Sequence, residues 1–286
     1  MKNFNIHRFG LTLRQDLLSH KRLLMRTFLG MFAACFLILM IAFFEDIVAP
    51  TQIMIDGSLQ FDYANHDHAK AFMTVVIFVV FLQGASLIFS NLRTKEERIA
   101  FLALPATRLE KFLVRWIYGT VVYVALFCLA LIAADLLRYA ITPLIGPGRP
   151  PLVFPEVFAD IVPKINVNYV GSVGDFNETY VRDVRPWILA SLAMISVWLH
   201  SVYMLGSSLF RKYAWINTTI AGIAIFLVLV VVISNLPDME LETKLTSLRL
   251  SKACVAVAFV LTVFNYWASY RVFSRIQVVP RKWINI

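Results

Sequence analysis

The amino-acid sequence predicts an all-α, polytopic integral membrane protein with six transmembrane helices. Hydrophobic residues make up 59% of its 286 residues and charged residues only 16%, whereas soluble domains carry about 25% charged residues. The apolar residues are concentrated in six stretches, each long enough to cross the hydrocarbon core, which takes about 20 helical residues. The six predicted transmembrane helices cover residues 23–44, 71–92, 116–137, 187–210, 215–236 and 253–273.

A soluble protein with six buried helices is the alternative explanation of these stretches. It is excluded because the polar segments between them are too short to cover six apolar helices. In addition, no stretch carries a charge at its centre, where a charge is costly in a membrane. We therefore expect residues 1–286 to form a single transmembrane domain.

Residues 1–22 precede the first predicted transmembrane helix and are polar and basic, so we expect no cleavable signal peptide. Ile6, Phe9, Leu13 and Leu17 recur at helical spacing, and charged residues occupy the other faces. This pattern predicts an amphipathic helix that lies in the cytoplasmic interface of the membrane. An ordinary cytoplasmic tail is the alternative.

Basic residues are distributed unequally between the two sides of the predicted membrane domain. If the N-terminus lies inside, the inner segments hold 18 of the 27 Lys and Arg residues but only four of the 18 acidic residues. The positive-inside rule then places both termini in the cytoplasm. The net charge of +9 is thus explained by contact with the anionic inner leaflet. The expected partner is the lipid bilayer and not nucleic acid.

The segment between the second and third predicted helices carries the strongest local signals. The capping-box pattern T-x-x-E, which marks the start of a helix, occurs at Thr94 and again at Thr107. Between them, Pro105 disfavours helix at the residue before it and removes a backbone donor. We therefore expect a short helix over Lys95–Ala103, a break at Pro105, and a new helix that starts after Thr107 and enters the third span.

Polar side chains inside the predicted spans share helical faces in the cytoplasmic halves of their helices. They either line a polar vestibule that serves as a translocation path or form hydrogen-bonded packing between helices. The candidate path residues are Gln83 and Ser86 in the second helix, Ser196, His200 and Tyr203 in the fourth, and Thr262 and Asn265 in the sixth. Asp135 is the one acidic residue inside a span, and we expect it to pair locally with Arg138.

The sequence lacks the residue patterns of common catalytic and cofactor sites. It contains neither a P-loop for ATP phosphates nor an H-E-x-x-H zinc motif. The spans hold no two ionisable residues at one depth, as an intramembrane hydrolase needs. His66 and His68 flank Asp67 in an outer loop, but such a pattern is more often incidental than a metal site. We expect no catalytic residues, no metal and no cofactor on this chain.

Around the break at Pro105 the chain resembles the ABC-2 type permeases, the six-helix membrane subunits of bacterial ABC exporters. The resemblance lies in a loop of the form L-x-L-P-A-T-R that follows the second helix. It is carried by Leu102, Leu104, Pro105, Ala106, Thr107 and Arg108. The six spans, the N-terminal interfacial helix and the inside termini match the family's topology.

The resemblance implies that Lys95–Ala103 is a coupling helix, which docks on a separate ATP-hydrolysing subunit and passes its motion to the spans. The ATPase-coupling residues would be Lys95, Glu96, Glu97, Arg98, Phe101, Leu104 and Pro105, with Glu96, Glu97 and Arg98 in direct contact. ATP would bind only to the partner. The resemblance also implies an exporter of the bacterial cytoplasmic (inner) membrane that works as a homodimer or as a heterodimer with a second permease.

One feature departs from the family pattern, in which the larger outer elements lie between the fifth and sixth helices. Here the long outer loop, residues 138–186, joins the third and fourth helices and is expected to fold over the outer mouth. A non-transporting membrane sensor or assembly module that uses this loop is therefore an alternative function. A secondary transporter using His200 or Asp135 is a third possibility, although no inverted repeat supports it.

Overall fold

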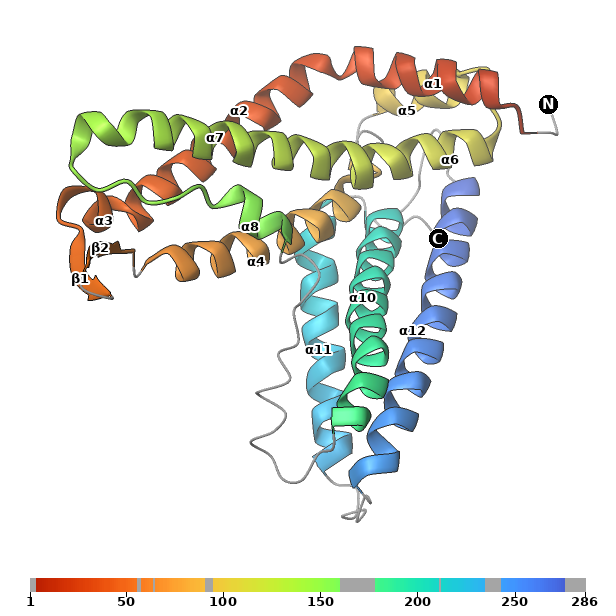
Figure 1. The fold of residues 1–286 in the computed structure, drawn as a ribbon. Coiled ribbons are helices and arrows are strands. Elements are labelled where there is room, and N and C mark those ends of the chain that lie inside the picture. The colour runs from red at the N-terminus through yellow and green to blue at the C-terminus, as the bar shows by residue number, and fades with distance from the viewer. Residues whose placement is uncertain are drawn as a thin grey trace. The chain divides into compact units, whose positions relative to one another are not determined.

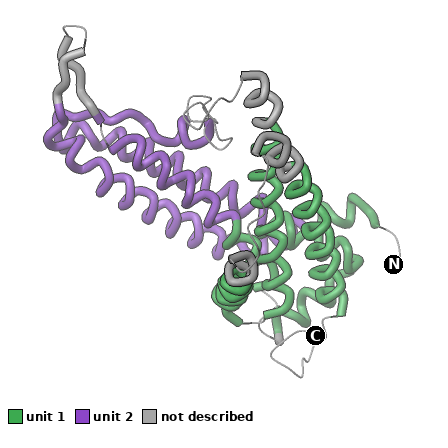
Figure 2. Tube along the Cα trace, turned by 90° about the horizontal axis from the view of Figure 1, so that it is seen from below, with its two compact units in different colours: residues 1–12, 82–119, 163–286 green, residues 13–81, 120–162 purple. Residues whose placement is uncertain are grey.

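A computed structural model of the chain describes residues 4–55, 58–63, 65–90, 95–159, 178–210, 212–234 and 243–275. Within them the regular secondary structure is helical apart from one two-stranded hairpin. It forms two compact units (Figure 2). Unit 1 is built from Met1–Thr12, Leu82–Gly119 and Pro163–Ile286, and unit 2 from Leu13–Phe81 and Thr120–Val162.

The elements follow one another as labelled in Figure 1. The first half holds α1 (Ile6–Ser19), α2 (Lys21–Ala42), α3 (Phe44–Val48), β1 (Thr51–Ile55), β2 (Ser58–Asp62), α4 (Asn65–Leu87), α5 (Lys95–Ala103) and α6 (Arg108–Ile117). A π-helical turn, η2 (Tyr118–Val122), then leads into α7 (Tyr123–Ile145). The remaining helices are α8 (Phe154–Ala159), α10 (Glu178–Leu209), α11 (Ala214–Ser234) and α12 (Thr243–Ser274).

The chain has the helices of a multi-pass membrane protein. Five helical stretches in the described ranges are long and apolar enough to cross a membrane: Lys21–Ala42, Asn65–Leu87, Arg108–Ile145, Pro186–Leu209 and Lys252–Ser274. They contain or overlap the first four predicted spans and the last one. The predicted span 215–236 overlaps α11, whose described apolar part, Ala214–Val228, is shorter, so the sixth crossing stays a prediction.

Unit 2 is held together by packing of α2 on α7. Leu39 of α2 and Phe43, which follows α2, are fully buried in one apolar cluster with Phe127 and Leu131 of α7. Cys35 belongs to the same apolar cluster, which agrees with its expected role as a small packing residue.

Unit 1 contains α10, α11 and α12, which lie side by side (Figure 1). α11 packs closely against α10 at Gly206, where a Cβ atom would come 1.8 Å from Thr218 Oγ1. At the C-terminal end of α12, Phe273 packs among the rings of Phe89, Phe101 and Phe112, at centroid distances of 5.2 to 6.3 Å. We call these four residues the aromatic cluster.

Several segments expected as loops contain helices or strands. The segment expected as a loop between the first two spans contains α3 and an antiparallel hairpin that pairs Thr51 with Asp62. As a result, α4 begins at Asn65, six residues before the predicted span 71–92, and ends at Leu87. The predicted loop 138–186 is helical at both ends, because α7 continues to Ile145 and α10 already begins at Glu178. Its residues 160–177 lie outside the described residues.

The turn after α7 approaches α3 so closely that it has room only for glycine. Gly148 N donates to Ile47 O at 3.0 Å, and a Cβ atom on Gly148 would lie 1.8 Å from Asp46 O. We expect Gly148→Ala to lower the free energy of unfolding by at least ~1–3 kcal/mol, because a backbone atom must move. Thermal unfolding in mild detergent would measure this.

Gly30→Ala in α2 is the matched control for this substitution. No atom lies within 4 Å of the added methyl group, and alanine favours helix over glycine by about 0.5–1 kcal/mol. The control should therefore unfold at the same temperature as the wild type or slightly higher. A Gly148→Ala variant as stable as this control would contradict the described packing of the turn on α3.

Candidate functional site

The candidate site is the helix–break–helix element in unit 1 formed by α5, residues 104–106 and α6. The predicted short helix is confirmed with its bounds, Lys95–Ala103. The chain bends at residues 104–106, where Ala106 N donates to Leu104 O at 2.8 Å. The new helix begins at Arg108. Pro105 thus ends one helix and separates it from the next, as its missing backbone donor requires.

The predicted capping box at Thr107 is confirmed and fixes the start of α6. Glu110 N donates to Thr107 Oγ1 at 3.2 Å, and Thr107 N donates to Glu110 Oε2 at 2.7 Å. Two backbone donors at the start of α6 are therefore satisfied. The other predicted box begins at Thr94, which lies outside the described residues.

Glu110 also ties the N-terminal segment to α6, a role that the sequence did not reveal. Its side chain is fully buried. Oε1 accepts from Asn5 N at 2.8 Å and from Arg8 Nη2 at 2.6 Å, while Oε2 accepts from Arg8 Nε at 2.8 Å. The two-pronged contact with Arg8 is the strong geometry for an arginine–carboxylate pair. One carboxylate thus joins the start of α1 and the start of α6.

The C-terminal turn of α5 is held by basic residues of α6. Lys111 Nζ donates to Leu102 O at 2.8 Å and so satisfies a carbonyl in the last turn of α5. The Arg115 guanidinium lies 4.9 Å from the centroid of the Phe101 ring, within the range of a cation–π contact. Because both contacts come from α6, α5 and α6 are held in a fixed relation.

Burial separates the predicted coupling residues into two groups. Glu96, Glu97 and Pro105 are exposed, and Leu104 is half-buried. Arg98 and Phe101 are only 4% and 5% exposed. Arg98 was expected to contact a partner directly, but its side chain is buried inside unit 1. Lys95 is the first residue of α5.

Ile99 is also exposed and follows Glu96 by about one helical turn of α5. Its side chain is 46% exposed. We call Glu96, Glu97 and Ile99 the docking face. It combines one apolar side chain with two carboxylates.

The candidate path residues of α10 and α12 lie mainly where these two helices pack together. His200 Nδ1 is 3.0 Å from Tyr266 Oη, and Asn265 Nδ2 donates to Ser201 Oγ at 3.0 Å. On the other side of α10, Tyr203 Oη is 2.9 Å from Thr219 Oγ1 of α11. Three predicted residues thus join neighbouring helices, as polar side chains do in membrane bundles. The sequence pattern missed their partners, which stand outside the predicted faces.

The other candidate path residues bond within their own helices. Ser86, Ser196 and Thr262 donate to the carbonyl oxygens of Gln83, Leu192 and Ala258. Thr262 and Ser86 are buried, whereas Gln83 is exposed. The structure therefore brings together the α10 and α12 groups but leaves the pair in α4 as a separate local contact.

The predicted ion pair between Asp135 and Arg138 is confirmed, and it anchors part of the outer loop to α7. Both side chains are fully buried, with Arg138 Nη2 2.8 Å from Asp135 Oδ1. Asp135 Oδ2 accepts from the backbone N of Val153 at 2.6 Å and of Phe154 at 3.0 Å. Arg138 Nη2 donates to Pro151 O at 2.6 Å.

The histidines of the outer segment do not form a metal site with their neighbours in the described part of the chain. There, no group of three or more His, Cys, Asp and Glu side chains could hold a metal ion. Instead, His66 Nε2 lies 3.1 Å from Glu156 Oε1, and Lys70 Nζ lies 2.9 Å from Asp67 Oδ1.

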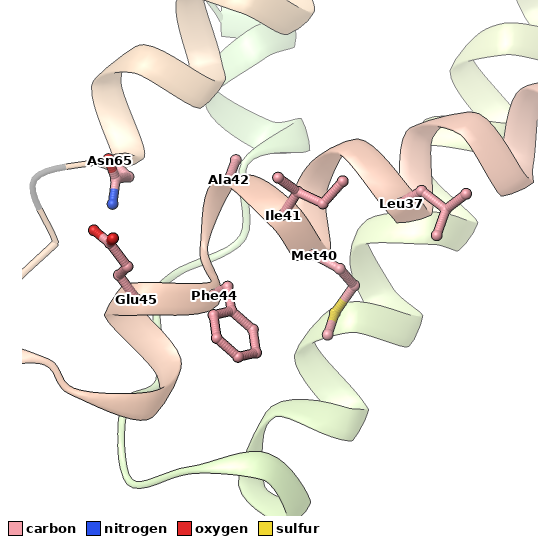
Figure 3. Close-up of a pocket in the computed structure, with 7 residues that line it drawn as sticks. All are labelled: Leu37, Met40, Ile41, Ala42, Phe44, Glu45 and Asn65. Carbon is pink, nitrogen blue, oxygen red and sulfur yellow. The ribbon is translucent and has the colours of Figure 1, made fainter.

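Unit 2 carries an apolar hollow of about 620 Å³ at the end of α2 (Figure 3). Leu37, Ile41 and Phe44 line it and are more than half exposed. Glu45 and Asn65 supply its polar end. Exposed apolar side chains of this kind suit contact with lipid tails.

Comparison of the chain with known protein families, with curated proteins and with solved structures finds no match. The choice between functions therefore rests on the residues and contacts described above.

Proposed function

We propose that the chain is the membrane-spanning permease subunit of an ABC exporter of the bacterial inner membrane, powered by a separate ATP-hydrolysing subunit. The observation that carries the proposal is the α5–α6 element. A short helix with an exposed docking face is held at its C-terminal turn by α6 and follows an apolar helix long enough to cross a membrane. This is the construction expected of a helix that receives force from a soluble partner.

The buried side of α5 offers a route by which such force reaches the membrane helices. Phe101 packs edge-on against Phe273 of α12, with the ring centroids 6.3 Å apart. Phe112 of α6 packs against the same Phe273 at 5.7 Å. Close-packed interiors transmit displacement because they contain few voids. A push on the docking face would therefore move the cytoplasmic end of α12.

In this proposal the translocation path opens where α10 and α12 separate. His200 and Asn265 would then exchange their present partners for substrate or water, because each already offers a hydrogen-bonding group between α10 and α12. The chain would act as a dimer, either with itself or with a second permease, and would bind no nucleotide of its own.

Charge reversal of the docking face tests the proposal. Glu96→Lys, alone and with Glu97→Lys, should weaken assembly with the ATPase at least about tenfold. Basic residues of the ATPase that face the two carboxylates would then meet lysines, and like charges across an interface are strongly unfavourable. The measurement is the amount of P-loop ATPase that co-purifies with the chain in mild detergent. Both residues are exposed, so the fold should persist.

Glu45→Lys is the matched control, since Glu45 is also exposed but is expected on the opposite side of the membrane. It should leave ATPase assembly unchanged. If no stoichiometric ATPase co-purifies with the wild type, and the Glu96 and Glu97 reversals change nothing, the proposed function is wrong.

The alternative function, a sensor or assembly module, is favoured by the anchored outer segment. Asp135 and Arg138 hold residues 150–154 against α7 through buried hydrogen bonds. Deletion of residues 150–159, including α8, distinguishes the two functions. Loss of a bound partner other than the ATPase, with ATPase assembly intact, would favour the module.

A further inference from the structure

A cavity of about 410 Å³ lies in unit 1 beside the break between α5 and α6. One part of its wall is apolar and includes Leu104, Pro105 and Phe273. Another part is basic and consists of Arg108 and Lys111. A cavity with these two kinds of wall suits a ligand that carries both an anionic group and an apolar group.

The basic wall has no acidic partner in the described part of the chain. No carboxylate there lies within 4.0 Å of Arg108 or Lys111. Lys111 is only 5% exposed, and its single hydrogen bond, to Leu102 O, leaves two of its three N–H donors unused. A buried ammonium without an anionic partner is costly. The cavity therefore lacks the anion that these two cations would favour.

The sequence of side chains along α12 indicates the depth of this cavity in the membrane. Exposed apolar residues continue to Phe264 and Trp267, which are 56% and 54% exposed. One turn further, the Arg271 guanidinium lies 5.3 Å from the centroid of the Trp267 ring. Tryptophan followed by a basic residue is typical of the membrane–water interface. Phe273, in the cavity wall, is therefore at the level of the lipid headgroups.

We propose that this cavity binds the phosphate headgroup of an anionic phospholipid from the cytoplasmic leaflet. Arg108 and Lys111 face the phosphate, and Leu104 and Phe273 contact the apolar part of the lipid. Basic pockets between membrane helices on the cytoplasmic side are suited to such headgroups. The proposal rests on the cytoplasmic placement of the α5–α6 element in the proposed function, but not on transport.

A bound lipid would regulate the coupling element. It would connect the break at Leu104 and Pro105 to the end of α12, so that α5 keeps its position when no ATPase is bound. The chain would then couple efficiently only in a membrane that contains anionic lipid.

Native mass spectrometry of the purified chain, without ATPase, tests the proposal with dioleoyl phosphatidylglycerol and dioleoyl phosphatidylcholine as probes. The wild type should retain phosphatidylglycerol in preference to phosphatidylcholine. Arg108→Gln should weaken retention of phosphatidylglycerol about fivefold, the contribution typical of one basic residue at an anionic membrane surface. Lys111→Gln should weaken it at least as much, and neither should change retention of phosphatidylcholine. Arg22→Gln in α2, also exposed and basic, is the matched control and should behave as the wild type.

Three results would overturn the lipid site. The first is that Arg108→Gln retains phosphatidylglycerol as well as Arg22→Gln does. Arg108 is exposed, so this variant stays informative if Lys111→Gln fails to fold. The second is that inorganic phosphate alone protects the α5–α6 amides from hydrogen exchange as strongly as phosphatidylglycerol does. This result would indicate a site for free phosphate.

The third is an Arg108→Gln variant that loses ATPase assembly but retains phosphatidylglycerol, which would assign the cavity to the protein partner. Because the lipid measurement uses the chain without ATPase, its failure leaves the proposed function untouched. Equally, absence of ATPase assembly would not change the lipid result.

Discussion

Replacing Arg138 by methionine is expected to destabilise the chain by ~3–5 kcal/mol, the largest effect on stability among the substitutions considered. The substitution leaves the Asp135 carboxylate buried and without its ion-pair partner, a situation that costs about this much. It also removes the donors to Pro150 O and Pro151 O and the cation above the Phe43 ring, at 4.5 Å. Reversible unfolding in mixed micelles would measure the loss.

A double-mutant cycle separates the ion pair from the packing around it. Asp135→Asn alone should also be strongly destabilising, because it leaves the buried Arg138 cation uncompensated. The double variant Asp135→Asn/Arg138→Met should be more stable than the sum of the single effects predicts, since no buried charge remains. Additive effects, or single variants as stable as the wild type, would contradict the buried pair.

Removing the Glu110 carboxylate is expected to have the largest effect on coupling. Glu110→Gln can keep the capping box, because glutamine also serves at this position, but it loses the charge that pairs with Arg8. The start of α1 should then open about tenfold more often, because one charge-assisted hydrogen bond accounts for a difference of this size. Glu110→Ala loses the box as well and should also loosen α6.

Hydrogen exchange of the α1 and α6 amides measures this prediction without any partner. Arg8→Gln should increase exchange in α1 as much as Glu110→Gln does. Arg14→Gln, which removes an exposed arginine of the same helix, should leave the exchange unchanged. With the ATPase present, Glu110→Gln and Arg8→Gln should both lower stimulated ATP hydrolysis. If exchange in α1 is the same in Glu110→Gln and Arg14→Gln, the Arg8–Glu110 pair does not stabilise the start of α1.

The α5–α6 element was predictable because its signals are local. A proline fixes where α5 must end, and a Thr and a Glu three residues apart fix where α6 begins. Each of these effects acts within one helical turn, so a single sequence suffices to place them. The bounds of α5 and the contacts of Thr107 with Glu110 agree with the structure for this reason.

The hairpin after α3 has a local sequence signal, but the prediction divided the chain only into membrane spans and loops and did not use it. Asp56 and Gly57 stand between two apolar stretches, and Asp-Gly in this position is a strong hairpin signal. Assigning the whole segment to an outer loop set this signal aside. The segment expected as a loop therefore contains the hairpin and the first residues of α4, which begins at Asn65.

The contacts that define the site most closely could not be predicted, because they join distant parts of the chain. Arg8 and Glu110 are 102 residues apart, and nothing in either local pattern selects the other. The polar residues of α10 were predicted as a set, but their partners depend on how α10 is rotated against α12. A rotation of α10 by about 140° about its axis would exchange Ser201 for Ser196, and no periodicity in the sequence selects between these two rotations.

Site-specific photocrosslinking from Ile99 tests the central claim most directly. Ile99 belongs to the docking face and is 46% exposed, so a photoreactive amino acid there should crosslink in cells to a protein that contains a P-loop. The same probe at Phe226 in α11, which is 64% exposed but predicted to face lipid, should not. Crosslinks to a P-loop protein from Ile99 alone would support a chain driven by a docked ATPase. Their absence from Ile99, in cells where the wild-type chain is fully active, would contradict it.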